Sequence, residues 1–171
     1  QISCGMRASP GAISKVFFDP EIENHIALET IENKKPAGIC GSGVIDALAA
    51  MRKADVTIAS GNLNTSHPLV TSDDNGIGRS FLLPGSDINI TLNDIRQVQL
   101  AKAALYVGIE SLIKKAGITK VDRTILTGAF GAKFNWQNAR DIGMLPHVIC
   151  KEKIESAKNL AGTGAVMALL D

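Results

Sequence analysis

Hydrophobic positions near the amino end of the chain follow short runs typical of strands. Ala12 to Phe18 and His25 to Ile31 are aliphatic and β-branched runs, and Asp19-Pro20 separates them. Runs of this composition that are bounded by turn residues indicate paired strands. We therefore expect an antiparallel pair, which the chain enters through a turn at Ser9-Pro10-Gly11.

Residues 41 to 54 predict an amphipathic helix. Val44, Ile45 and Leu48 recur at the spacing of one helix face. Ser42 can serve as the N-cap, because its hydroxyl can accept a hydrogen bond from a free backbone N–H of the first turn.

The middle of the chain has a different composition. Between residues 59 and 78 it is rich in Ser, Asn, Asp and Gly and has no period, so we expect an exposed loop excursion. Short strands are predicted at 79–83 and 88–91, with Pro84-Gly85 as the turn between them.

The longest predicted element is a helix from Thr91 to Ala116. Thr91 and Asp94 have the spacing of a capping box, and Gly117 marks the end of the helix. One face is formed by residues that recur three and four positions apart, namely Val98, Ala101, Leu105, Gly108, Ile109, Leu112 and Ala116.

The last third of the chain predicts a strand and two helices. Residues 124 to 127 are apolar on both faces, which favours a central strand of a mixed sheet. A helical stretch through 138–142 is expected to end at Gly143. The final helix, from Gly162 to Leu170, carries small residues whose spacing would let another helix pack closely, namely Ala161, Gly164, Ala165 and Ala168.

Length and composition limit the possible classes of protein. The chain has 171 residues, 45% hydrophobic and 20% charged, so it can bury one core, and we expect a single α/β domain over 1–171 with a mixed sheet flanked by helices. The net charge is +1 and no basic block is present, which argues against nucleic acid or a membrane surface as partner.

The cysteines indicate a cytoplasmic protein. Cys4, Cys40 and Cys150 are odd in number, far apart and without the spacing of metal ligands, so we expect reduced thiols. No apolar stretch is long enough to span a bilayer, and no leader peptide is evident. The chain starts at Gln1 rather than Met, so we expect it to be a piece of a longer protein.

Catalytic motifs are scarce. The sequence has no Walker-type phosphate loop, no dinucleotide-binding Gly-x-Gly-x-x-Gly turn, no His-Glu-x-x-His and no Gly-x-Ser-x-Gly. Its three histidines stand alone, each more typical of a surface or strand position than of a catalyst. No catalytic or metal-binding residue is therefore predicted.

Glycine clusters are the remaining candidates for a binding site. Gly41, Ser42 and Gly43 begin a helix, where backbone N–H groups favour an anion or a ribose hydroxyl, although close packing would equally explain them. Another cluster follows a strand, the usual ligand position in an open α/β sheet, but it is also compatible with a tight turn. It consists of Gly128, Ala129, Phe130 and Gly131. A third cluster, residues 162–164, begins the last helix, and this position is more typical of a structural role than of a binding site.

The order of these features resembles the second, ribonuclease H-like lobe of the superfamily that joins sugar kinases, actin and the heat-shock chaperone ATPases. In that lobe the strand-to-glycine turn is the adenosine motif, and the closing helix of small residues packs at the hinge. Several blocks narrow the resemblance to the C-terminal domain of the reductive activators of corrinoid proteins. These blocks are residues 1–13, 37–46, 94–103, 125–131, 142–146 and 161–170.

This resemblance implies more than the chain itself contains. Members of the family carry an iron–sulfur cluster on an N-terminal domain, and their ATPase domain uses ATP and magnesium to drive the return of cob(II)amide to cob(I)amide in a corrinoid protein of methyl transfer. The chain is similar to the later part of that ATPase domain, so its Asp-x-Gly-Thr phosphate turns would lie upstream. By this resemblance the fragment alone would be inactive and hold no cofactor.

Two hypotheses of different class follow. In the first, the chain is part of an ATP-dependent activator, and the two clusters 41–43 and 128–131 line the adenosine site. In the second, the glycine turns only allow packing, and the chain is a non-catalytic docking or dimerisation module for a corrinoid protein or methyltransferase. The chain departs from the family pattern after the second cluster, where Ala132 and Asn135-Trp136 stand in place of the expected Asn and Asp-Pro. This departure concerns the adenosine contacts that the first hypothesis would place beyond the glycines.

Overall fold

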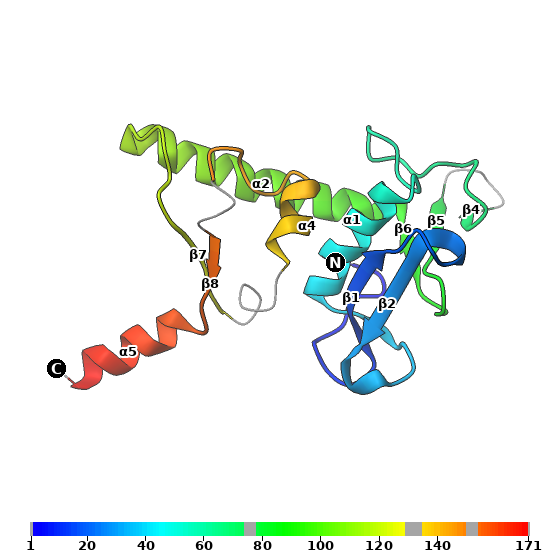
Figure 1. The fold of residues 1–171 in the computed structure, drawn as a ribbon, viewed down its shortest axis with the longest axis horizontal. Coiled ribbons are helices and arrows are strands. Elements are labelled where there is room, and N and C mark those ends of the chain that lie inside the picture. Colours follow the sequence, from blue (N-terminus) through cyan, green and yellow to red (C-terminus); the bar gives the residue numbers. More distant parts are fainter. Residues whose placement is uncertain (1, 74–77, 129–134, 150–153, 171) are drawn as a thin grey trace. The chain divides into compact units, whose positions relative to one another are not determined.

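The computed structural model describes residues 2–73, 78–128, 135–149 and 154–170. The chain divides into two compact units, 1–104 and 105–171, and each is described by itself. Both contain helices and short strands, as expected of an α/β protein (Figure 1). The expectation of one domain over the whole chain stays a prediction.

The first unit begins with a small mixed sheet. Strand β1 (Ala12–Phe18) pairs antiparallel with β2 (Ile26–Thr30) and parallel with β3 (Gly38–Ile39). The antiparallel pair and its entry turn were predicted, and Gly11 in that turn has φ +84°. Single-turn helices η1 (Glu23–His25) and η2 (Ile31–Asn33) flank β2.

Helix α1 (Gly41–Lys53) packs on β1 and forms the core of this unit. Its side chains between Gly43 and Met51 are buried, and so are Ile13 and Val16 of β1. The predicted helix is confirmed, but the prediction that Ser42 is its N-cap is wrong. Cys40 holds that position, in extended conformation and without a side-chain cap. The Ser42 hydroxyl instead donates to the Ser14 carbonyl at 3.0 Å.

A second sheet of the first unit is antiparallel throughout. It consists of β4 (Val70–Ser72), β5 (Arg79–Leu82) and β6 (Asn89–Thr91). The two later strands were predicted. The expectation that 59–78 has no regular structure is wrong at 70–72, where pairing with β5 makes a strand, and Leu63 is buried at 2% exposure.

Helix α2 (Leu92–Ala116) is the longest element and runs through both units. Its predicted capping box is present, since the Asp94 N–H donates to Thr91 Oγ1 and the Thr91 N–H donates to Asp94 Oδ2, both at 3.0 Å. Gly117 ends it with φ +65°. Only Asp94, Ile95 and Val98 of the helix are buried. The expected apolar face is therefore buried only at its beginning, and Leu112 is 69% exposed.

The second unit contains a parallel pair, β7 (Thr124–Leu126) and β8 (Ile154–Ser156). Helix α4 (Trp136–Asp141) lies between them in sequence, and α5 (Leu160–Leu170) follows β8. The expectation that 124–127 is a central strand with both faces buried is wrong. Among the described residues β7 pairs only with β8, and Ile125 is 40% exposed.

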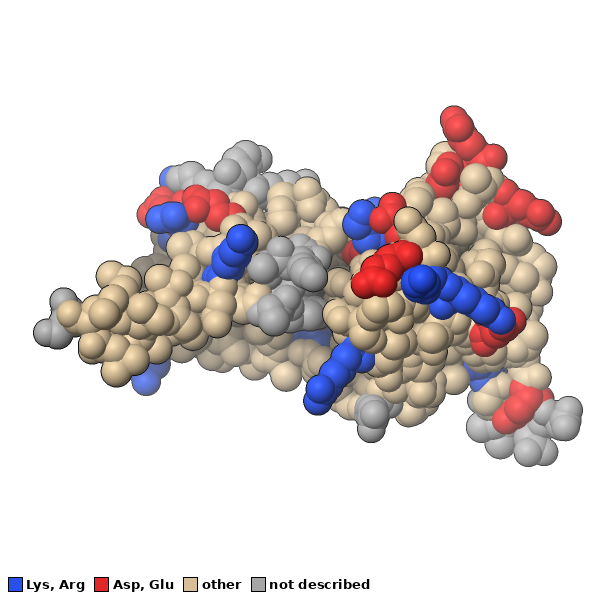
Figure 2. Space-filling model, turned by 90° about the horizontal axis from the view of Figure 1, so that it is seen from below, with Lys and Arg blue, Asp and Glu red and all other residues tan. Residues whose placement is uncertain are grey.

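Helix α5 has no buried residue, so the close helix packing expected from its small residues is absent from the part of the chain that the structure describes. Helix α5 contains no charged residue, and its side chains are tan at the left of Figure 2. Within the described ranges, no helix combines the length and apolar composition needed to cross a bilayer.

Candidate functional site

The first candidate cluster, Gly41 to Gly43, lies at the amino end of α1, directly after β3. Cys40 precedes it with φ −90° and ψ 172°, so the chain leaves the sheet extended and then turns into the helix. Cys40 supplies no side-chain cap, so the first N–H groups of α1 receive no hydrogen bond from its side chain. Gly41 is exposed, whereas Gly43 is buried.

Gly43 is required by packing. A Cβ at this position would overlap the Ile13 carbonyl oxygen of β1 and lie 2.9 Å from Ile39 Cγ1. Ser42 also contacts β1, because its hydroxyl donates a hydrogen bond to the Ser14 carbonyl. The same hydroxyl lies 3.3 Å from Cys40 Sγ. The close-packing interpretation therefore explains Gly43, while Gly41 is the member of the cluster that faces solvent.

The second candidate cluster begins at Gly128, at the carboxyl end of β7. Gly128 has φ +87°, and no atom of the described residues lies within 4 Å of the position that a Cβ would take, apart from the glycine's own chain neighbours. A residue with a side chain would be strained there, and the side of the backbone that it would cover is open. Ala129, Phe130 and Gly131 lie outside the described residues.

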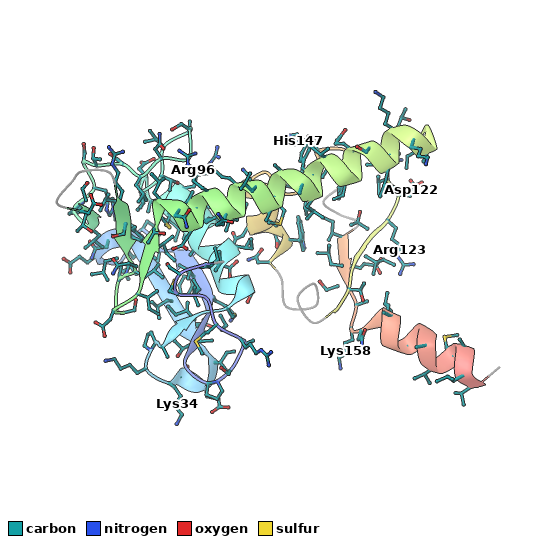
Figure 3. All side chains as sticks on the ribbon, turned by 180° about the vertical axis from the view of Figure 1, so that it is seen from behind. Lys34, Arg96, Asp122, Arg123, His147 and Lys158 are labelled. Atoms are coloured by element: carbon teal, nitrogen blue, oxygen red, sulfur yellow. The ribbon has the colours of Figure 1, made fainter. Side chains whose placement is uncertain are left out.

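Hydrogen bonds join the carboxyl ends of β7 and β8. The Ala157 N–H donates to the Leu126 carbonyl at 2.8 Å, which continues the parallel ladder by one step. The Thr127 hydroxyl donates to the Lys158 carbonyl at 2.8 Å and accepts from the Leu160 N–H at 3.1 Å. Figure 3 labels Lys158 at this end of the pair. Thr127 therefore fixes Gly128 next to the first turn of α5.

The start of α5 is capped within the same group of residues. Asn159 Oδ1 accepts from the Gly162 N–H at 3.1 Å, and the Thr163 hydroxyl donates to the Asn159 carbonyl at 3.2 Å. A Cβ at Gly162 would lie 2.6 Å from Asn159 Nδ2, which fits the structural role that the sequence favoured for this glycine. At the opposite end of the pair, Arg123, which Figure 3 labels, donates to both carboxylate oxygens of Glu155, at 3.1 and 2.8 Å. That ion pair lies on an exposed surface, and the backbone pairing of the strands sets their register.

The carboxyl ends of β7 and β8, together with Gly128, form an edge that suits a flat ligand. Ligands of open α/β sheets bind beyond the carboxyl ends of parallel strands, and here both carboxyl ends meet at one edge. The open space over Gly128 would let a planar group approach the backbone. The two clusters belong to different units, and each is considered by itself.

No metal centre is found in the described part of the chain. No group of three or more His, Cys, Asp or Glu residues there could hold a metal ion. Cys4 and Cys40 are free thiols, as expected from the sequence, and Cys150 lies outside the described residues. Burial raises the pKa of the Cys4 thiol, and the nearby Asp94 carboxylate raises it further.

One polar cluster was missed by the sequence analysis. Asp94 is 2% exposed and accepts hydrogen bonds from Ser3 as well as from Thr91. Burial alone would raise the pKa of Asp94, but these hydrogen bonds outweigh burial and hold the pKa below its ordinary value. The capping box signalled the Thr91 contact. Ser3 is 91 residues away, and no local pattern indicates its contact.

Comparison with known proteins agrees with this architecture. A family model described as the C-terminal domain of RACo, the ASKHA domain, matches residues 1–171. A solved structure, the reductive activator for corrinoid, iron-sulfur protein, superimposes with a TM-score of 0.83 at 32% identity, over 99% of this chain and 28% of that one.

Two curated relatives are similar in sequence. Corrinoid activation enzyme RamQ of Eubacterium limosum is 35% identical over 99% of this chain and 30% of its own length. The [Co(II) methylated amine-specific corrinoid protein] reductase of Methanosarcina barkeri is 30% identical over 85% of this chain and 28% of its own length. The chain thus spans less than a third of the relatives that it matches.

The fold and the whole-chain match define the class, which is that of the ASKHA domains. Within that class the chain belongs to the family of the C-terminal domain of RACo. The resemblance to the corrinoid-activator family that the sequence motifs indicated is confirmed.

Proposed function

We propose that the chain is part of the ATPase domain of a reductive activator that uses ATP to return cob(II)amide to cob(I)amide in a corrinoid protein. The observation that carries the proposal is the joined carboxyl edge of β7 and β8, with open backbone at Gly128. The relatives named above, which activate or reduce corrinoid proteins, support the choice of substrate.

The proposed role of this chain is to hold the adenosine side of ATP. The residues that we propose for this role are Gly128, Ala129, Phe130 and Gly131 and, separately, the turn of Gly41, Ser42 and Gly43. ATP supplies free energy by its hydrolysis to ADP and phosphate. The phosphate and magnesium ligands, and the iron–sulfur cluster that donates one electron to cobalt, would belong to other parts of a longer protein.

Coupling would then depend on the partner. An ATPase drives an unfavourable electron transfer only if its two nucleotide states bind the corrinoid protein with different affinity. We therefore propose a corrinoid protein as the partner. We also propose the cytoplasm as the location, because the cysteines are expected to be reduced thiols. A methyltransferase or a second copy of the chain would be a further partner under the alternative below.

The alternative is a non-catalytic docking or dimerisation module. The exposed apolar side chains of α5 favour it, since a helix that is apolar all round is usually buried. They are Leu160, Val166, Met167, Leu169 and Leu170, with exposures from 44% to 85%.

Paired glycine variants of the intact protein distinguish the two functions. Gly128→Ala puts a methyl group over the open backbone at φ +87°. Gly117→Ala is the matched control, because Gly117 has φ +65°, also has open space, and lies at the end of α2. Each variant should cost about 1–2 kcal/mol of backbone strain.

ATP affinity is measured by calorimetry and stability by thermal unfolding. We expect Gly128→Ala to raise the Kd for ATP about ten-fold, or about 1.4 kcal/mol, while Gly117→Ala leaves it unchanged. ATP affinity that is equal in both variants and the unaltered protein would overturn the adenosine site at Gly128 and favour the docking module.

A further inference from the structure

A buried carboxylate joins two distant parts of the first unit. Asp94 accepts four hydrogen bonds, two from Ser3 and two from Thr91. The Ser3 backbone N–H donates at 2.7 Å and its hydroxyl at 2.6 Å. The Thr91 N–H donates at 3.0 Å and its hydroxyl at 2.7 Å. The Thr91 bonds cap α2, whereas the Ser3 bonds are not needed for the cap.

The segment after Ser3 pairs with the strand that leads into the first glycine cluster. The Ile39 N–H donates to the Cys4 carbonyl, and the Met6 N–H donates to the Ile39 carbonyl, both at 2.9 Å. Gly5 and Ile39 form a parallel bridge. Strand β3 therefore lies between β1 on one side and residues 4–6 on the other.

The packing of this segment on β3 leaves no spare room. A Cβ at Gly38 would lie 2.9 Å from the Cys4 carbonyl oxygen and 2.7 Å from Met6 Sδ. Gly43, at the start of α1, is in equally close contact with Ile39 and β1. Because packed interiors transmit displacements, a shift of residues 4–6 would be passed through β3 to the start of α1.

We propose that Asp94 is a positioning residue for the glycine turn 41–43, acting through Ser3 and the segment 4–6. The inference rests on the proposed function, in which this turn lines the adenosine site. Ser3 anchors the segment to Asp94, the segment aligns β3, and β3 delivers Gly41 to the place where the nucleotide would bind. Asp94 has no contact with the ligand in this scheme.

The charge of Asp94 strengthens the anchor. Hydrogen bonds from Ser3 and Thr91 keep its pKa below the ordinary value against the effect of burial, so the carboxylate is ionised near neutral pH. Hydrogen bonds to an ionised acceptor are stronger than those between neutral groups.

Two substitutions in the intact protein separate positioning from stability. Ser3→Ala and Thr91→Val each delete one hydroxyl that donates to the same atom, Asp94 Oδ2. Ser3→Ala weakens the anchor of residues 4–6. Thr91→Val weakens the cap of α2 and leaves that anchor in place. ATP binding is measured by calorimetry, stability by thermal unfolding, and the mobility of 38–44 by amide hydrogen exchange.

We expect Ser3→Ala to raise the Kd for ATP about five-fold, because the loss of about one net hydrogen bond lets the turn leave its binding arrangement part of the time. Exchange of the amides in 38–44 should accelerate as well. Thr91→Val should lower Tm at least as much but change the Kd less than about two-fold, since a loss of stability alone does not reach the turn.

Two results would overturn the inference. One is a Kd for ATP in Ser3→Ala that equals that of the unaltered protein, and the other is an equal rise in both variants. An unaltered intact protein that binds no ATP would overturn the proposed function and this inference with it, whereas ATP binding insensitive to Ser3→Ala would overturn the inference alone.

Discussion

At Gly43 the backbone of α1 lies directly against β1. We expect Gly43→Ala to destabilise the intact protein by about 1–3 kcal/mol, because its Cβ would overlap the Ile13 carbonyl and force the helix away from the strand. Gly108→Ala in α2 is the control, since nothing lies within 4 Å of its Cβ and alanine favours a helix interior. Thermal unfolding checks both, and equal stability of the two variants would contradict the packing argument.

Residues bound to near neighbours were predictable, and those bound to distant ones were not. The contact of Thr91 with Asp94 spans three positions and has a known spacing. Ser42 failed as a predicted N-cap because its hydroxyl bonds Ser14, 28 residues away, across a sheet that the local pattern does not reveal. The contact of Ser3 with Asp94, which spans 91 positions, was missed for the same reason.

The second sheet of the first unit is organised around Phe81, which is fully buried. The rings of Phe81 and His67 meet edge to face, with 5.6 Å between their centroids, and the strand of Phe81, β5, pairs with β4 and β6. We expect Phe81→Ala to destabilise the intact protein by about 3–5 kcal/mol. Burial, with a smaller effect of His25, lowers the pKa of His67, so the variant should return that pKa toward its ordinary value.

Histidine-selective NMR titration measures the His67 pKa, and Phe81→Leu keeps an aliphatic side chain at the site in case the alanine variant unfolds. Leu82→Ala is the matched control, because Leu82 is the next residue of β5, points to the opposite face and is 36% exposed. A His67 pKa that stays lowered in Phe81→Leu and Phe81→Ala would contradict the view that this ring buries His67.

Elements with a strong local pattern formed where the sequence predicted them. Strand β1, helix α1 and helix α2 have the expected bounds within about two residues, because period and caps define them locally. Strand β4 was missed, since only its pairing with β5 makes it a strand. Apolar runs predict burial but do not name the element that covers them, which is why β7 and α5 are more exposed than expected.

At the scale of the molecule, the sequence predicted the α/β class and the family more completely than the site. Blocks spread over the whole chain carry the resemblance, so an error in one strand does not remove it. The site depends on single positions. Gly128 has a positive φ, which fits a ligand turn and a tight turn alike, whereas Gly43 is explained by packing, and 129–131 lie outside the described residues.

The isolated chain of 171 residues should lack ATPase activity. It spans less than a third of its relatives, and the family resemblance places the Asp-x-Gly-Thr phosphate turns in another part of the protein, whereas phosphoryl transfer needs ordered metal and phosphate ligands. Half of a cleft also leaves much of a nucleotide in water, which limits affinity.

We expect hydrolysis no faster than in buffer and weak or no binding of ATP, measured by phosphate release and calorimetry on a sample shown to be folded by circular dichroism. The intact protein is the positive control. Magnesium-dependent turnover by the isolated chain would mean that its own side chains include the catalytic groups, and that the phosphate site must be sought here.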